Sequence, residues 1–227
     1  GSSLAQVLAE VGDETPYIGE PEYFREAFTS VQELLERGAL VAGHDISAGG
    51  LITTLLEMCF ANEQGGLEVD LSAIPETDLV KLLFAENPGV VVQTSHPELL
   101  EVLTAASIGF ARIATPTATG RTLTIRQGKQ HLALDIDAKR ELWYRPSFLL
   151  DRYQSGEALA EARCTNYSKQ PLRYAFPEGF TGKLADLKAN PDRTTKAPVR
   201  AAILRDKGTN GEREMAYALY LAGFDVK

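Results

Sequence analysis

Residues 44–51, with the sequence HDISAGGL, combine residue types that suit phosphate and magnesium binding. Gly49 and Gly50 stand where a helix is expected to begin, so a ligand could approach the backbone closely and meet unpaired amides that favour anions. Asp45 offers a hard carboxylate oxygen, which magnesium prefers alongside substrate phosphates. Ser47 could contact a phosphate. The segment therefore predicts an anion site with one metal ligand.

A purely structural interpretation of the same segment is equally well supported by its spacing. Ser47 could be the N-cap of the helix, and the two glycines could allow the helix to pack tightly against its neighbours. A Gly-Gly pair alone is a weak functional signal. Both interpretations stay open at this point.

Other reactive residues give weaker signals. Cys59 has apolar neighbours in an expected helix and Cys164 lies in an expected linker, so neither matches the strand-to-helix turn that carries a nucleophile. Their spacing indicates neither a zinc site nor a disulfide framework. The loop at residues 208–211 (GTNG) could offer backbone amides to a ligand, but an ordinary turn is favoured. We expect no catalytic residue in this chain.

The segment 44–51 is positioned by a strand and a helix on either side. Apolar residues recur at three-and-four spacing through residues 21–37, which predicts an amphipathic helix ended by Gly38. Residues 39–42 predict a short buried strand, and residues 51–62 predict a second helix. The glycines therefore fall on a turn from strand to helix.

The following residues predict a mixed sheet covered by helices. Expected strands lie at residues 67–71, 90–92, 110–114, 122–125 and 131–136, the last two joined by a hairpin at residues 127–129. A helix opens near residue 96 and runs to residue 106. Another helix is expected over residues 137–153, with Lys139, Arg140, Arg145 and Arg152 on a solvated face.

The last third of the chain has a different character. Residues 154–197 show no regular periodicity and predict an extended linker. A buried strand at residues 199–204 and a helix at residues 212–222 then predict the start of a new α/β domain. The chain opens on Gly-Ser-Ser without a methionine and stops as a second strand begins, so we expect an internal fragment of a longer protein.

Composition excludes several classes of function. The chain has 227 residues, 44% of them hydrophobic, with a net charge of −8 and a pI near 5.0. This balance provides no basic surface for nucleic acid. No apolar run approaches the length of about 20 residues needed to cross a bilayer. We expect a cytoplasmic protein with neither nucleic acid nor membrane as a partner.

Two groups of motifs resemble known families. Residues 44–51, followed by 55–58 (LLEM) and 83–86 (LFAE), resemble the C-terminal domain of the aminoimidazole ribonucleotide synthetase superfamily, which includes selenophosphate synthetase and thiamine monophosphate kinase. Residues 201–212 (AAILRDKGTNGE), with 214–216 and 222–225, resemble the opening of the glutaminase domain in the large formylglycinamidine ribonucleotide synthetase family. The two in this order are more specific than either alone.

This resemblance implies a domain organisation. Residues 1–153 would be the second synthetase-like C-terminal domain of the large enzyme, an α/β (α+β) fold with a mixed sheet and covering helices. Residues 154–197 would be a linker, and residues 198–227 the truncated start of a flavodoxin-like, class I glutamine amidotransferase domain. Its partners would be the preceding synthetase-type domains and the rest of the glutaminase domain in the same chain.

The resemblance also implies a function for the parent enzyme. That enzyme converts formylglycinamide ribonucleotide to the amidine in purine biosynthesis, with ATP and with ammonia from glutamine. This half would hold an auxiliary nucleotide (ATP or ADP) with magnesium in a structural role, completed by the preceding domain. Asp45 matches a magnesium ligand and Ser47 a nucleotide contact, and His44, Gly49 and Gly50 are further candidates. Alone, the fragment is expected to be inactive.

Two rival interpretations remain. The chain could belong to another synthetase of the same superfamily, which the glutaminase-like tail argues against. It could also be a non-catalytic interaction module that keeps the fold. Ala48 departs from the family pattern, which commonly has an acidic residue there, so the number of magnesium ions stays open.

Overall fold

The computed structural model describes residues 2–13, 16–169, 174–187 and 189–227. The chain divides into two compact units, residues 1–167 and residues 168–227. Each unit is described by itself.

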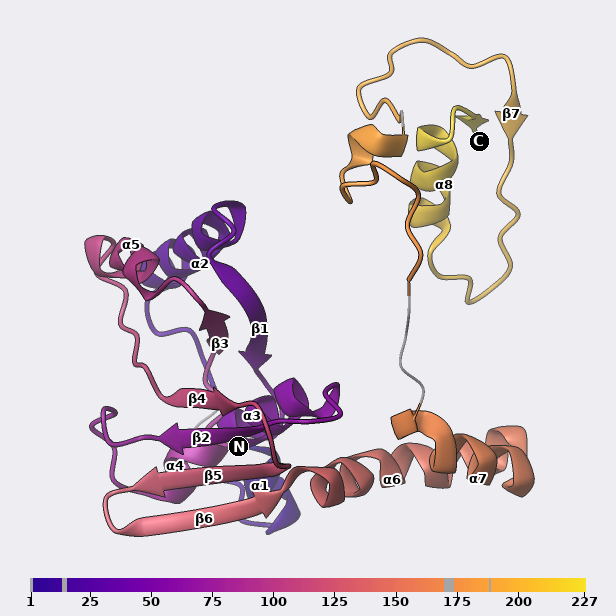
Figure 1. The fold of residues 1–227 in the computed structure, drawn as a ribbon. Helices are drawn as coiled ribbons and strands as arrows, with labels where there is room; N and C mark the ends of the chain where they lie inside the picture. The colour runs from indigo at the N-terminus through magenta and orange to yellow at the C-terminus, as the bar shows by residue number, and fades with distance from the viewer. Residues whose placement is uncertain (1, 14–15, 170–173, 188) are drawn as a thin grey trace. The chain divides into compact units, whose positions relative to one another are not determined.

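In its described residues, the first unit contains helices that precede and follow the motif along the chain, together with six strands (Figure 1). The α-helices are α1 (Ser3–Val7), α2 (Pro21–Glu36), α3 (Gly50–Phe60), α4 (Leu79–Phe84), α5 (Glu101–Ala105), α6 (Ile136–Ser155) and α7 (Glu157–Asn166). The strands are β1 (Leu40–Ile46), β2 (Gly66–Asp70), β3 (Gly89–Thr94), β4 (Ala114–Thr117), β5 (Thr122–Gln127) and β6 (Gln130–Asp135). Short 3₁₀ turns lie at η1 (Pro97–Leu100) and η2 (Tyr167–Lys169).

The main sheet is mixed, as expected from the sequence. Its order is β4-β2-β5-β6, with β2 and β5 parallel and the other neighbours antiparallel. The alternation in β2 and β5 turns one set of side chains into a core with α3, α4 and the start of α6 (Figure 1). The fully buried members of this core include Leu71, Leu123, Ile125 and Ile136.

A second, smaller layer carries the motif strand. Strands β1 and β3 form an antiparallel ladder of their own, in which Asp45 lies opposite Val90. Beside it, α2 and α5 bury Leu34 and Leu103 in a separate apolar cluster. The helix predicted at residues 21–37 and the strand at residues 90–92 are therefore confirmed.

The expected strand at residues 110–114 is wrong in its position. Residues 110–113 form no strand, and β4 begins at Ala114. The physical reason is strand pairing. β4 forms its ladder with β2, and β2 ends at Asp70, whose amide donates to the Ile113 carbonyl at 2.8 Å. Residues before Ile113 therefore lie beyond the end of this ladder. The hairpin predicted at residues 127–129 is confirmed, with Gln127 of β5 paired to Gln130 of β6.

The extended linker predicted from residue 154 is wrong at its beginning. Residues 157–166 form α7, which buries Ala160 and is tied to α6 where Arg163 donates to Asp151 at 2.5 Å. The sequence EALAEARCTN is rich in strong helix formers, and its short apolar face was not recognised as periodic. Parts of the predicted linker at 170–173 and 188 lie outside the described residues.

Two arginines close the C-terminal end of α3. Arg121 donates to the carbonyls of Cys59 and Gly65 at 3.4 and 3.2 Å, and Arg140 donates to the carbonyl of Phe60 at 3.1 Å. Both guanidinium groups also bind the same carboxylate oxygen of Asp137, at 2.9 and 3.1 Å. The side chain of Arg140 is only 15% exposed, so its predicted place on a solvated face is wrong. These cations satisfy the orphan carbonyls of the helix end.

Replacing Asp137 by asparagine is expected to lower the free energy of unfolding by about 1 kcal/mol at pH 7, since the carboxylate is partly exposed. The hydrogen bond from Arg121 holds the pKa of Asp137 below its ordinary value. A depressed pKa contributes stability above roughly pH 4, the ordinary value, and that contribution is lost as the pH falls through the folded-state pKa. The free energies of unfolding of the two proteins, measured with urea from pH 7 to pH 2.5, should therefore converge in acid. Glu63→Gln, which removes an exposed carboxylate, is the control; a constant gap across this range would contradict the linkage.

The second unit contains a small β-α-β arrangement. Strands β7 (Arg200–Ala201) and β8 (Asp225–Val226) are parallel, α8 (Glu212–Leu221) joins them, and η3 (Leu184–Leu187) precedes them. The predicted helix at residues 212–222 is thus confirmed. The strand predicted at 199–204 is shorter than expected because its partner contains only two residues, although flanking bonds join Val199 and Ile203 to residues 225 and 227.

Residues before β7 also belong to this unit. Arg193 donates to the carbonyls of Tyr220 and Phe224 at the end of α8, at 3.4 and 2.6 Å, and its guanidinium lies 4.5 Å from the Tyr220 ring centroid. The Tyr220 hydroxyl donates in return to the Arg193 carbonyl at 2.6 Å. This reciprocal contact closes the helix C-terminus.

Candidate functional site

The motif at residues 44–51 lies where β1 passes into α3. His44 and Asp45 belong to the strand, which runs further into the motif than the sequence predicted, and Ser47 to Gly49 form the turn. The amide of Gly50 donates to the Ser47 carbonyl at 2.9 Å, which closes that turn.

The glycines are required by backbone conformation and by packing. Gly49 and Gly50 have φ of 90° and 71°, the left-handed region that favours glycine. A Cβ on Gly50 would lie 2.6 Å from the Leu83 carbonyl oxygen and 2.8 Å from the Phe84 Cα, at the end of α4. The predicted packing role is therefore present, and at Gly50 the close neighbour is the protein's own backbone.

A carboxylate from the segment between α4 and β3 occupies the start of α3. The amide of Gly49 donates to Oε1 of Glu86 at 2.8 Å, and the amide of Ser3 donates to the same oxygen at 2.7 Å. Burial raises the pKa of the Glu86 carboxyl, but these hydrogen bonds outweigh burial, so its net pKa lies below the ordinary value. Negative charge is favourable at this end of a helix. From the sequence, Glu86 is noticeable only as the last residue of the LFAE match, without a predicted role.

Ser47 is not the helix cap that one interpretation predicted. The N-cap position is Gly49, without a side-chain capping bond, and Ser47 is exposed in the turn. Its hydroxyl is therefore placed where a ligand could meet it. The other neighbour, Ala48, is also exposed and contributes no polar group.

Asp45 presents its carboxylate to solvent, with 74% of the side chain exposed. Nδ1 of His44 lies 3.5 Å from its Oδ1. Among the described residues, no group of three or more His, Cys, Asp or Glu side chains could hold a metal ion. Magnesium commonly takes one or two protein carboxylates together with phosphate oxygens and water. Asp45 fits as one such ligand.

His44 is engaged on both ring nitrogens. Nδ1 lies 2.7 Å from the carbonyl oxygen of Asp45, and Nε2 lies 3.1 Å from Oε2 of Glu57 on α3. The ring was predicted as a phosphate-site candidate, but its polar atoms are directed to partners within the chain. Glu57 was not singled out from the sequence, because it looked like an ordinary polar position of a helix.

The two cysteines lie apart from the motif turn. Cys59 is buried near the end of α3, and Cys164 is half-buried in α7. Burial raises the pKa of the Cys59 thiol, with Arg121 opposing it in part. A raised pKa disfavours the thiolate, which is the reactive form.

Comparison with protein families shows where this chain belongs. The family described as AIR synthase related protein, C-terminal domain, matches residues 1–125, more than half of the chain. The chain belongs to this family. Its mixed α/β fold agrees with the expectation from the HDISAGGL motif.

Relatives of this AIR synthase related chain include much longer proteins. Phosphoribosylformylglycinamidine synthase of Homo sapiens is 38% identical over all of this chain, which covers 17% of that relative. The synthase of Drosophila melanogaster is 32% identical, again over all of this chain and 18% of the relative. The chain therefore spans about a sixth of the length of the curated relatives it matches.

A solved structure described as T. maritima PurL complexed with ATP is also similar, with a TM-score of 0.47 and 16% identity over 53% of this chain and 22% of that one.

In the part of this AIR synthase related chain that the structure describes, no helix combines the length and apolar character needed to cross a membrane.

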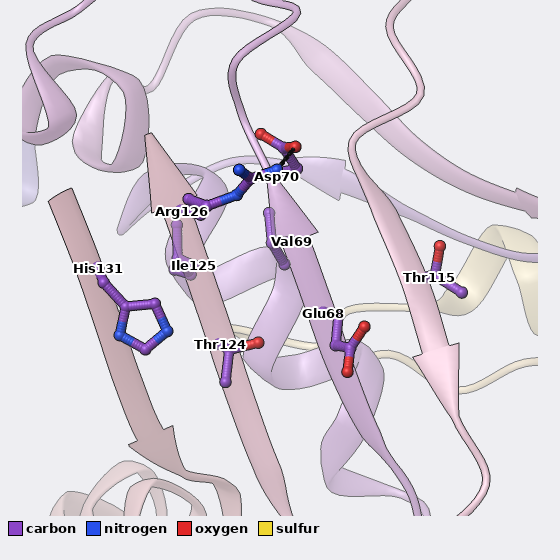
Figure 2. Close-up of a pocket in the computed structure, with 8 residues that line it drawn as sticks. All are labelled: Glu68, Val69, Asp70, Thr115, Thr124, Ile125, Arg126 and His131. Atoms are coloured by element: carbon purple, nitrogen blue, oxygen red, sulfur yellow. Dashed lines mark hydrogen bonds and ion pairs between the residues drawn. The ribbon is translucent and has the colours of Figure 1, made fainter. Parts of the chain in front are cut away.

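A shallow hollow of about 360 Å³ lies on the main sheet, and the sequence analysis did not single it out. Figure 2 shows side chains from all four strands around it, with Glu68 on β2, Thr124 on β5, Thr115 on β4 and His131 on β6. Arg126 forms an ion pair with Asp70 there. These residues alternate with the buried ones, so the hollow is on the face of the sheet opposite the core. The alternation of buried and polar residues along these strands was the sequence signal that could have revealed this face.

Proposed function

We propose that this chain is part of a multidomain phosphoribosylformylglycinamidine synthase, which converts formylglycinamide ribonucleotide to the amidine with ATP and glutamine. The observation that carries the proposal is the 38% identity to the human synthase along the whole chain, well past the 125 residues of the AIR synthase related domain. A lone AIR synthase related domain would not extend the match through β7 and α8. The cytoplasmic location stays a prediction from the sequence.

Within this enzyme, the first unit contributes one wall of an auxiliary nucleotide and magnesium site, and the second unit opens the glutaminase domain. The support for the wall is the exposed carboxylate of Asp45 beside the exposed Ser47, on a turn whose backbone is fixed by Gly49 and Gly50. Magnesium, when bound, would neutralise phosphate charge there. The missing ligands come from the preceding synthetase-type domain, so the isolated chain is inactive.

The role of Glu86 in this wall follows from its hydrogen bonds. Its carboxylate already satisfies the Gly49 amide, so the start of α3 carries a built-in negative charge. Phosphate groups of a nucleotide would be repelled from that amide unless a cation lies between them. This arrangement favours contact through Asp45 and a magnesium ion over direct binding of phosphate to the helix N-terminus.

Asp45→Ala in the full-length synthase is expected to lower retained nucleotide at least about tenfold, with a smaller loss of turnover. Retained ADP or ATP would be quantified after desalting, and amidine formation would be measured with glutamine and ATP. Glu68→Ala, which removes an exposed carboxylate from β2, should retain nucleotide as the unmodified enzyme does. Equal nucleotide content in Asp45→Ala and unmodified enzyme would remove Asp45 from the site.

The same assay tests the wider assignment. The 227-residue chain alone should form no amidine, and the full-length synthase should. If the full-length protein makes no amidine from formylglycinamide ribonucleotide, another synthetase of the superfamily or a non-catalytic module becomes the better assignment.

A further inference from the structure

Three side chains form a continuous path of polar contacts from the motif strand to α6. Nε2 of His44 lies 3.1 Å from Oε2 of Glu57, and the indole Nε1 of Trp143 donates to Oε1 of the same Glu57 at 2.7 Å. Each carboxylate oxygen of Glu57 therefore has one partner. His44 and Glu57 are 29% and 25% exposed, so water screens this path less than it screens a surface pair.

The path ends on the backbone of Asp45. Nδ1 of His44 lies 2.7 Å from the Asp45 carbonyl oxygen, which also accepts a hydrogen bond from Thr54 Oγ1 at 2.9 Å. Thr54 and Glu57 are three residues apart and therefore share one face of α3. One helix face thus holds the backbone of Asp45 directly through Thr54 and indirectly through His44.

Trp143 fixes the far end of the path. Its ring packs against Phe60 with centroids 5.5 Å apart and an interplanar angle of 56°, a favourable tilted arrangement. The half-exposed indole is therefore held by this ring contact and by its hydrogen bond to Glu57. Both ring nitrogens of His44 have partners within the chain, and Nδ1 also lies 3.5 Å from Oδ1 of Asp45.

We infer that Glu57 and Trp143 are positioning residues for the motif, and that they act through His44 to hold Asp45 with its carboxylate outward. This inference rests on the proposed nucleotide and magnesium site and assigns His44 a supporting place in it. Partners that orient a metal ligand commonly change metal affinity by about 10- to 100-fold when they are removed.

The first test uses the 227-residue chain, in which Trp143 is the only tryptophan and its indole N–H gives a single NMR signal. Glu57→Ala should shift this signal and speed its exchange with solvent by about tenfold, the effect of losing one hydrogen bond. His44→Ala should shift the same signal less, through Glu57. Glu57→Gln should stay close to the unmodified chain, because an amide can still accept from the indole. An unchanged indole signal in His44→Ala would overturn the proposed path from His44 through Glu57 to Trp143.

The second test measures nucleotide retained by the full-length synthase. Glu57→Ala is expected to lower the affinity for magnesium-ADP about tenfold, and Glu57→Gln to restore it to within about threefold. Glu161→Ala, on an exposed face of α7, is the matched control. Loss of nucleotide in Asp45→Ala but not in Glu57→Ala would overturn the positioning role while the proposed function stands. Retention of nucleotide by Asp45→Ala would instead reject the proposed site. The indole signal would then still test whether His44, Glu57 and Trp143 form the path.

Discussion

Replacing Gly50 by alanine is expected to lower the free energy of unfolding of the first unit by about 3 kcal/mol, as the sum of two effects. A left-handed backbone costs a non-glycine residue about 1–2 kcal/mol. The new methyl group would also meet the Leu83 carbonyl oxygen at 2.6 Å, and backbone atoms cannot rotate out of the way. Urea unfolding followed by Trp143 fluorescence measures this unit, because the only tryptophan lies in α6.

Gly120→Ala separates the two effects. Gly120 has φ of 84°, but a Cβ there meets nothing within 4 Å. Its alanine variant should lose only the conformational part, about 1–2 kcal/mol. Equal losses at the two positions would mean that α3 and α4 do not approach as closely as the structure has them.

The Gly50 variant also bears on function. The start of α3 carries the turn with Ser47 and follows the strand with Asp45, so a displaced helix would move both candidate contacts together. Retained nucleotide in the full-length synthase should therefore fall in Gly50→Ala and persist in Gly120→Ala.

Leu123→Ala is expected to be about equally costly, with a loss of about 3 kcal/mol in the free energy of unfolding. Leu123 is fully buried between Leu67 and Leu134 of the neighbouring strands, within the core cluster that α3 covers. Truncation leaves a cavity that this close-packed layer cannot fill. The midpoint of urea unfolding should fall while the slope with denaturant stays constant.

Thr124→Ala is the matched control on the same strand. Thr124 points to the hollow on the opposite face of the sheet, so its loss should change stability by less than about 1 kcal/mol. Because strand side chains alternate between faces, a reversal of the two effects would indicate a register shifted by one residue.

The two ends of α3 are secured in different ways, and this explains how the motif is held. At its start, Gly50 allows close approach to α4 and Glu86 satisfies the Gly49 amide. At its end, Arg121 and Arg140 donate to the carbonyls of Cys59 and Phe60. A helix restrained at both ends gives Thr54 and Glu57 a rigid base from which to hold Asp45.

Local sequence patterns determined much of the fold. Three-and-four spacing predicted α2, alternation predicted β2, and the turn at residues 127–129 predicted the hairpin of β5 and β6, because each depends on neighbours within a few residues. The motif at residues 44–51 was also recognisable from the sequence, and the family comparison agrees with it. The start of β4 and the presence of α7 were missed, since a strand partner and a short buried face are settled by packing.

The environment of the motif was decided by tertiary structure alone. Glu86 is 37 residues from Gly49, and Trp143 is 86 residues from Glu57, so no local pattern could pair them. The sequence by itself therefore determined which residue types stand at the strand-to-helix turn and where the regular elements form. Only the folded chain decided that Gly50 abuts backbone, that Ser47 is exposed and that His44 turns inward, because these depend on which distant segments meet around α3.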